Sequence, residues 1–347
     1  MRTSVVAAVH PRASWLDVVV SQAPAEALVN HSDLAPSSLH ATTLGHAPAA
    51  PWWRRAAAPG RALVLVAALV LVAFASASEA VVDDLGRPVV LERPAQRIVS
   101  MVPSHTEAVC ALERCDALVG RDTFSNHPVR VVDLPDLGSA FSPDLEALIA
   151  LEPDLVLVDE YSGLAEALAP FGIAVYAGTP QQLGDVFVLF ERFGRLLDAR
   201  AEAAALAAAV RERIDAVATA TAPLAAPSVY YELDASPYSV GPDGFIGTLI
   251  AIAGGANIVG AELGEFPLLD PEYIVAADPS VIILGNAPYG ESLETLRARP
   301  GWSGLSAVAH GRVVELTAEQ VDMISRPGPR LGDAVELLAR ILHPDLP

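Results

Sequence analysis

Residues 142–157 read SPDLEALIALEPDLVL, and residues 269–283 read LDPEYIVAADPSVII. The two stretches share residue types at matched positions, each pair 126 positions apart: Asp144 and Asp270, Glu146 and Glu272, Ala150 and Ala276, Pro153 and Pro279. Each copy predicts a helix that begins after an aspartate cap, ends at an acid–proline pair and leads into a buried strand. Similarity at a fixed spacing indicates a duplicated unit, so we expect two similar lobes.

Shorter echoes on either side of these stretches extend the repeat in the same order. They pair residues 117–120 (ALVG) with residues 257–260 (NIVG), and residues 172–175 (GIAV) with residues 311–314 (GRVV). From residue 95 onward, short apolar runs alternate with helical stretches, which is typical of βαβ units. The predicted fold class is therefore α/β, with two similar Rossmann-like lobes.

The first lobe is expected to open with a strand over residues 97–102. Ser104 and Glu107 match the S-x-x-E capping box, which predicts a helix over residues 106–112. Two more buried strands are expected over residues 155–158 and 173–176.

Residues 200–222 lie between the two copies, are rich in Ala and contain neither Gly nor Pro. One helix over this stretch would span about 35 Å at ~1.5 Å per residue, and it would permit only limited bending between the lobes. An ordinary helix packed within one lobe is the alternative. The predicted organisation is an N-terminal extension and signal peptide over 1–77 (the signal proper over 54–77), an N-terminal lobe over 78–198, an interlobe helix over 199–222 and a C-terminal lobe over 223–347.

The leader has the parts of a secretory signal peptide. Arg54, Arg55 and Arg61 precede an apolar run over residues 62–74, and the small residues 75–77 (ASA) follow it. The run is shorter than the ~20 residues of a membrane span, so we expect a cleaved signal and a periplasmic protein. An uncleaved signal anchor, which would make the chain a membrane-tethered sensor, is the alternative. No cysteine follows the apolar run, so no lipid anchor is expected at the mature N-terminus.

Composition excludes several functions. Among 347 residues, 22 are basic and 42 acidic, and this net charge of −20 would repel a nucleic-acid backbone. Every basic residue is Arg, and the absence of Lys excludes Schiff-base chemistry and the Walker-type phosphate lysine. Cys110 and Cys115 can form a disulfide if the helix that carries Cys110 ends near residues 113–114, but not if the helix continues.

No motif predicts catalysis or a resident metal. The sequence contains no G-x-G-x-x-G after the first strand and no G-x-S-x-G, and the histidines at 105, 127, 310 and 343 lack the spacing of a zinc site. A secreted hydrolase or metalloenzyme remains a rival class, but it would need clustered groups that the sequence does not offer.

Polar and aromatic residues follow the expected strand ends, where open α/β sheets bind ligands. The candidates are Ser104, His105, Phe124, His127, Phe141, Asp159 and Tyr161 in the first lobe, and Tyr238, Phe266, Met323 and Arg326 in the second. Each aromatic could instead fill the core. Together they predict a cleft between the lobes that holds a large, partly apolar ligand.

Several motifs occur in an order that resembles the substrate-binding proteins of ABC importers for cobalamin and ferric siderophores. They are DLGRPV (84–89), RIVSMVPSHTE (97–107), DLE (144–146) with PDLV (153–156), GGANI (254–258), RPGW (299–302) with AV (307–308) and GRV (311–313), and RPGPR (326–330). The resemblance spans residues 82–345. It implies a class III periplasmic binding protein fold, in which one rigid helix joins the lobes, and a non-enzymatic monomer that carries a small-molecule chelate to a membrane permease.

In that family, one surface glutamate on each lobe docks onto arginines of the transporter. The resemblance assigns this role to Glu146 and Glu272. Both residues would also favour the dipole of the helix in whose first turn they lie, so the two roles can coexist.

The resemblance implies cobalamin as the first choice of ligand, although the sequence departs from the aromatic lining of cobalamin binders. His127 stands where Tyr is expected, Ala140 and Asp159 stand where Trp is expected, and Tyr238 and Phe266 keep aromatic character in the second lobe.

A hydroxamate-type ferric siderophore is the second choice and haem the third. Carboxylate-rich siderophores should prefer several cleft arginines, and only Arg121 and Arg326 are candidates. His127 or Tyr161 could ligate haem iron. No cofactor is expected apart from the cobalt or iron of the ligand.

Overall fold

The computed structural model describes residues 80–346, which belong to one compact unit, Ala80–Pro347. The predicted extension and signal peptide, residues 1–77 with the signal proper at 54–77, lie outside the described residues. Within residues 80–346, no helix combines the length and the apolar character needed to cross a membrane.

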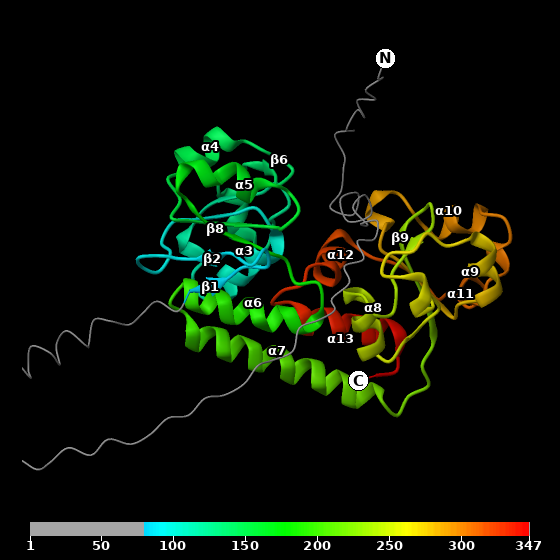
Figure 1. Cartoon of the computed structure of the whole chain (residues 1–347). Coiled ribbons are helices and arrows are strands. Elements are labelled where there is room, and N and C mark those ends of the chain that lie inside the picture. The colour runs from blue at the N-terminus through cyan, green and yellow to red at the C-terminus, as the bar shows by residue number, and fades with distance from the viewer. Residues whose placement is uncertain (1–79, 347) are drawn as a thin grey trace, which may run out of the picture. The chain divides into compact units, whose positions relative to one another are not determined.

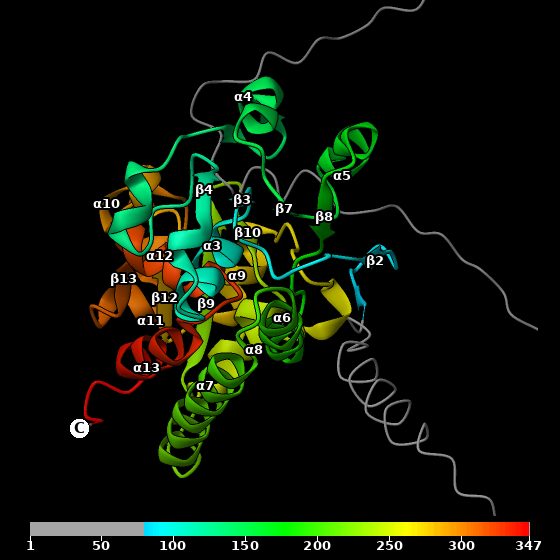
Figure 2. The same cartoon turned by 90° about the vertical axis from the view of Figure 1, so that its left-hand side faces the viewer.

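The first lobe is built around a parallel four-stranded sheet in the order β4-β3-β7-β8. Figure 2 shows these strands side by side in that order. The elements of this lobe are β1 (Val81–Val82), β2 (Pro88–Val89), β3 (Ile98–Ser100), α3 (Pro103–Ala111), β4 (Leu118–Arg121), β5 (Gly138–Ser139), β6 (Ser142–Pro143), α4 (Leu145–Ala150), β7 (Leu155–Val158), α5 (Leu164–Leu168), β8 (Ala174–Ala177) and α6 (Leu183–Leu196).

The second lobe repeats this plan. Its sheet runs β10-β9-β12-β13, and β11 pairs in parallel with β9. The elements are β9 (Ser228–Asp234), β10 (Tyr238–Ser239), α8 (Phe245–Ile252), β11 (Ala256–Asn257), α9 (Pro271–Ala277), β12 (Val281–Leu284), α10 (Leu293–Ala298), α11 (Ser306–Ala309), β13 (Val313–Glu315), α12 (Ala318–Ser325) and α13 (Leu331–Leu342).

The sequence repeat corresponds to a repeat of topology, as predicted. The repeated strands β7 and β12 each lie at the centre of their sheet, next to β3 and β9. The echoes fall on β4 and β11 on one side and on β8 and β13 on the other. All residues of β7 and of β12 are buried, because both faces of each sheet are covered.

The two repeated helices also begin and end alike. Asp144 caps α4 by accepting from the backbone N–H of Ala147 at 2.9 Å, and Asp270 caps α9 through Glu272 at 2.8 Å. The residues before the two prolines, at 152 and 278, have left-handed backbones with φ of 46° and 43°. A residue before proline avoids the helical region, so each helix ends at this point and the chain turns into its strand.

One long helix, α7 (Arg200–Thr221), follows α6 and leads into the second lobe. It packs against α6, α8 and α13, and Figure 1 shows it running beside α6 and α13. Arg213 of α7 pairs with Asp333 at 2.6 Å and with Glu336 at 2.8 Å, both on α13. The prediction of a single helix between the lobes is confirmed.

The predicted capping box at the start of α3 is wrong. The helix begins at Pro103, three residues before the predicted start, and Val102 is its N-cap without any side-chain hydrogen bond. Proline is favoured in the first turn because it has no N–H to satisfy there. Glu107 instead turns inward and binds two arginines of the C-terminal segment.

Helix α3 ends at Ala111, and Glu113 adopts a left-handed backbone with φ of 60°. The turn brings the Cα atoms of Cys110 and Cys115 within 4.0 Å, and the two residues form a disulfide. Of the two sequence alternatives, the structure therefore has the helix that ends early.

Candidate ligand-binding site

The loop after β4, residues 122–128, carries Phe124 and His127, two of the predicted ligand residues. Asp122 holds this loop from the side of its own lobe, because its carboxylate accepts from the backbone N–H of Phe124 at 2.9 Å and from the hydroxyl of Ser125. The Ser125 hydroxyl also lies 2.7 Å from that of Thr106 on α3. Burial raises the pKa of Asp122 from 3.8 to about 6, although the hydrogen bonds and nearby arginines oppose the rise.

Arg326, which follows α12, holds the same loop from the other side. Its Nη1 donates to Asn126 Oδ1 at 2.8 Å and to Glu107 at 2.9 Å, and its Nη2 donates to the Phe124 carbonyl at 3.0 Å. Nη2 also pairs with Asp322 at 2.8 Å. Each terminal nitrogen thus has two protein acceptors, and two of the four acceptors belong to the loop over residues 122–128. The role of Arg326 as a ligand contact stays a prediction.

Glu107 is the centre of a buried ion cluster. Arg330, at the start of α13, donates to both of its carboxylate oxygens, from Nε at 2.8 Å and from Nη2 at 2.7 Å. This paired geometry is the strong form of an arginine–carboxylate contact. The cluster joins α3 of the first lobe to the α12–α13 segment.

Ser104 and His105 were predicted in the cleft, and the structure buries both. The His105 ring is 0% exposed and packs edge-on against Tyr176 at 5.9 Å and Phe193 at 5.2 Å between ring centroids. Burial lowers the pKa of His105 to about 3, so the ring is neutral. Ser104 lies under Gly328, where an added Cβ would approach its carbonyl to 3.5 Å. Both residues follow a strand end, but α6 and the α12–α13 turn cover them.

The remaining first-lobe candidates are at least partly exposed. Phe141 is 41% and Tyr161 58% exposed, and Phe124, His127 and Asp159 are half-buried. Asp159 shapes the loop after β7, since its carboxylate accepts from the backbone N–H groups of Tyr161 and Ser162 at 2.7 and 2.6 Å. In the second lobe, Tyr238, Phe266 and Met323 are half-buried.

Charged groups of both lobes contribute to the pKa of Tyr161. Burial raises its pKa to about 12, and the next contributions come from Glu160, Glu265 and Asp159. Glu265 belongs to the second lobe, so residues of both lobes act on this hydroxyl. Burial also raises the pKa of Glu160 and of Glu265.

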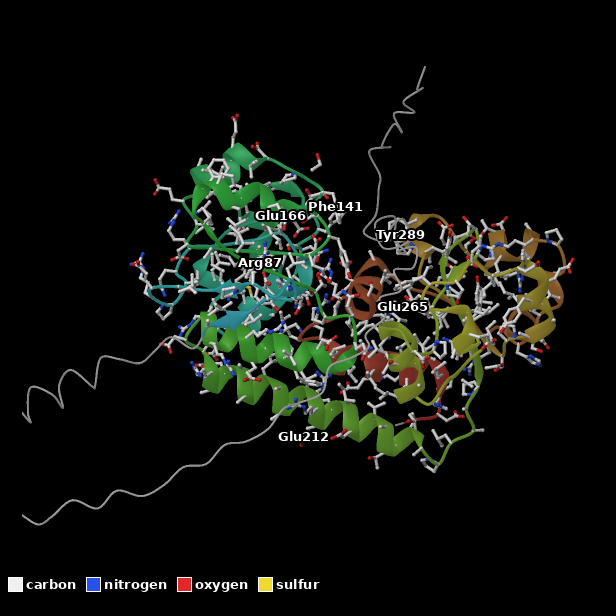
Figure 3. All side chains as sticks on the ribbon, in the orientation of Figure 1. Arg87, Phe141, Glu166, Glu212, Glu265 and Tyr289 are labelled. Carbon is white, nitrogen blue, oxygen red and sulfur yellow. A yellow bond between two sulfur atoms is a disulfide. The ribbon has the colours of Figure 1, made fainter. Side chains whose placement is uncertain are left out.

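Two residues of this region were missed at the sequence level, Glu265 and Tyr289. Figure 3 places Phe141 at the edge of the first lobe that faces the second lobe. It places Tyr289 and Glu265 at the edge of the second lobe that faces the first. Tyr289 is 61% exposed and ends a short turn after β12, as Tyr161 follows β7. The repeat offset of 126 maps Tyr161 onto Ala287, two residues before Tyr289, so the repeat points to this turn but not to the tyrosine itself, and no pattern points to Glu265.

A buried network supports the turn that carries Tyr289. Glu232, fully buried on β9, accepts from Arg299 at 2.6 and 2.8 Å and from the amide of Asn286 at 2.9 Å. Asn286 is the residue from which the Ala287–Tyr289 turn begins. The aromatic side chain is thus presented from a fixed base.

Glu146 and Glu272 lie in the first turns of α4 and α9, and both are exposed. The two helices occupy equivalent positions in the repeat. Among residues 80–346, no group of three or more His, Cys, Asp or Glu side chains could hold a metal ion.

Comparison with known proteins places the chain in a family. Residues 98–320 match the family described as periplasmic binding protein. An uncharacterized ABC transporter substrate-binding lipoprotein of Bacillus subtilis is 29% identical over 274 residues, which are 76% of this chain and 85% of that protein. A cobalamin-binding protein of Halobacterium salinarum is 30% identical over 273 residues, covering 75% of this chain and 73% of that protein.

Among solved structures, the periplasmic heme-binding protein RhuT from Roseiflexus in its apo form superimposes with a TM-score of 0.63 at 26% identity. The match covers 72% of this chain and 98% of that one. The fold of this chain, its repeated lobes and the family match all lead to the same conclusion. The chain belongs to the periplasmic binding protein family.

Proposed function

We propose that this chain is the substrate-binding protein of an ABC importer, that it captures cobalamin between its two lobes, and that it delivers this chelate to a membrane permease. Family membership and the named relatives support the importer role. The cobalamin-binding relative at 30% identity favours that ligand.

The charge around Tyr161 is the observation that carries the choice of ligand. Asp159, Glu160 and Glu265 all act on the Tyr161 hydroxyl, and within residues 80–346 no arginine forms an ion pair with any of the three. Carboxylates repel anions and accept hydrogen bonds from N–H groups. Cobalamin carries primary amides at its rim, so it suits this environment better than a chelate with free carboxylates.

The two arginines considered for anion binding are otherwise engaged. Arg121 donates to the carbonyls of Asp122 and Val132 at 2.9 and 3.2 Å and pairs with Asp136. Arg326 is engaged as described above. Neither arginine is therefore free to pair with the carboxylates of a siderophore or with the propionates of haem.

A hydroxamate-type siderophore and haem remain the alternative ligands. A hydroxamate chelate needs no cationic partner, and the heme-binding structural relative favours haem. His127 or Tyr161 would then be the iron ligand. The other-class alternatives, a secreted metalloenzyme or hydrolase and a membrane-tethered sensor, have no such support among the described residues.

Further parts of the proposal concern partners and location. Glu146 and Glu272 dock onto the permease, the protein acts in the periplasm as a monomer after cleavage of its leader, and it has no nucleic-acid partner, no resident cofactor and no enzymatic activity. Cys110 and Cys115 pair with each other in a disulfide.

The experiment is a calorimetric titration of residues 78–347 with cyanocobalamin, a ferric hydroxamate siderophore and haemin. We expect cyanocobalamin to bind with micromolar or tighter affinity and ahead of the other two. Preference for another chelate would replace the ligand, and no binding of any of them would refute the chelate-binding role.

A further inference from the structure

We infer that Arg326 is a positioning residue for ligand binding: it locks the ligand loop of the first lobe, residues 122–128, to helix α12. The inference rests on the proposed function and on Phe124 and His127 as the ligand contacts that the sequence predicts. The contacts of Arg326 are with the loop, with Glu107 and with Asp322 of α12.

Arg326 has acceptors on both the loop and helix α12. Two of them, the Phe124 carbonyl and Asn126 Oδ1, belong to the loop, and a third, Asp322, belongs to α12. Asn126 closes the arrangement, because its amide donates to Asp322 at 2.8 Å. Three contacts therefore tie the loop to the α12 segment, and the Arg326–Asp322 ion pair within that segment supports them.

The loop and helix α12 both carry predicted ligand residues. The loop presents Phe124 and His127, and α12 presents Met323, which is half-buried and next to Asp322 in sequence. Arg326 thus fixes candidate ligand contacts of the two elements relative to one another. Contacts that are held before the ligand arrives need no ordering when it binds, and this lowers the entropic cost of binding.

Comparison of Arg326 with Arg330 distinguishes positioning of the loop from general stabilisation of the fold. Arg326 and Arg330 both bind Glu107 in the same buried cluster, but only Arg326 reaches the loop. Loss of either guanidinium weakens the cluster. Only the loss of Arg326 also releases the loop. Arg330→Gln is therefore the matched control for Arg326→Gln.

Hydrogen exchange of the ligand-free protein tests the positioning directly. The reporters are the backbone N–H groups of Thr123, Phe124 and Ser125, which donate to Gly138, Asp122 and Asp122. We expect Arg326→Gln to speed their exchange about tenfold or more, Arg326→Lys to restore part of the protection, and Arg330→Gln to leave them unchanged. Equal effects of the Arg326 and Arg330 changes would overturn the inference.

The second measurement is the equilibrium affinity for cyanocobalamin. Arg326→Gln should weaken cyanocobalamin binding about tenfold, because the released loop must then be ordered when the ligand binds, while Arg330→Gln should not. Asn126→Ala, at an exposed position, should weaken binding in the same direction with little loss of thermal stability, so the test survives if Arg326→Gln fails to fold. Unchanged binding by Asn126→Ala would contradict the positioning role.

The two arms distinguish two failures. Exchange is measured without ligand, so a wild-type protein that does not bind cyanocobalamin would refute the proposed ligand and leave the loop measurement to decide the role of Arg326. The binding comparison would then use whichever chelate the titration identifies.

Discussion

Arg330 and Glu107 meet through two parallel hydrogen bonds, 223 residues apart in the chain, and Arg326 adds a third contact to the same carboxylate. The carboxylate is almost completely buried. This cluster makes the C-terminal segment part of the joint between the lobes, together with the ion pairs between α7 and α13.

Replacement of Glu107 should be strongly destabilising. In Glu107→Gln, two buried guanidinium groups lose their shared counter-charge, and breaking a buried pair on one side costs about 3–5 kcal/mol. Urea denaturation measures the loss. Glu212→Gln, an exposed change on α7, is the control and should shift the unfolding free energy by less than about 0.5 kcal/mol. Similar small shifts for both variants would contradict the cluster's structural role.

Asp122 should give the protein an unusual pH dependence. Burial raises its pKa from 3.8 to about 6 in the folded state, so between about pH 4 and pH 6 the folded state holds a proton that the unfolded state releases. The contribution of Asp122 to stability therefore falls as pH rises through that window, by on the order of 2–3 kcal/mol, and is constant above it.

The comparison variant is Asp122→Asn, which cannot titrate. The unfolding free energy of the wild type minus that of the variant should decrease from pH 4 to pH 6 in denaturant titrations. A difference that is independent of pH, or that grows with pH, would show that the pKa of the Asp122 carboxyl is not raised.

Glu265 should act on ligand choice through charge. Glu265→Gln removes one of the carboxylates near Tyr161, so haemin should bind roughly threefold more tightly while cyanocobalamin changes little. The gain should shrink at high salt, because a partly exposed charge is screened. Parallel titrations of both ligands, with Glu212→Gln as a charge-matched control, measure it. An equal effect of the two variants on haemin would place Glu265 outside the site.

The docking proposal separates binding from transport. Glu146→Ala combined with Glu272→Ala should preserve ligand affinity, because both residues are exposed in the first turns of surface helices and are not among the predicted ligand contacts. The double variant should abolish stimulation of the transporter's ATPase. Undiminished stimulation in reconstituted vesicles would refute docking through this pair.

The sequence predicted the fold more fully than the site, and particular residues show why. Asp144 and Asp270 act on neighbours two or three residues away, so their capping could be predicted from local pattern alone. Arg326 and Glu107 lie 219 residues apart, and no local pattern indicates that one neutralises the other.

The same limit explains the errors at the strand ends. A position after a strand predicts proximity to the edge where ligands bind, but His105 and Tyr161 both satisfy it, and only tertiary packing buries the first and exposes the second. Comparing the two copies of the repeat leads to the turn after β12, but the offset of 126 aligns Tyr161 with Ala287 and so does not single out Tyr289. Glu265 lies in a loop without any repeat signal, and its effect on the pKa of Tyr161 depends on the tertiary arrangement of the two lobes.

The central claim is that aromatic side chains from both lobes hold the chelate between them. Equilibrium binding of cyanocobalamin to the wild type and to the Tyr161→Ala, Tyr289→Ala double variant tests it most directly. We predict micromolar or tighter binding by the wild type and at least about a hundredfold loss in the double variant, since each buried aromatic contributes roughly 1.5–3 kcal/mol. Equal affinity of the two proteins, or no binding by the wild type, would contradict the account.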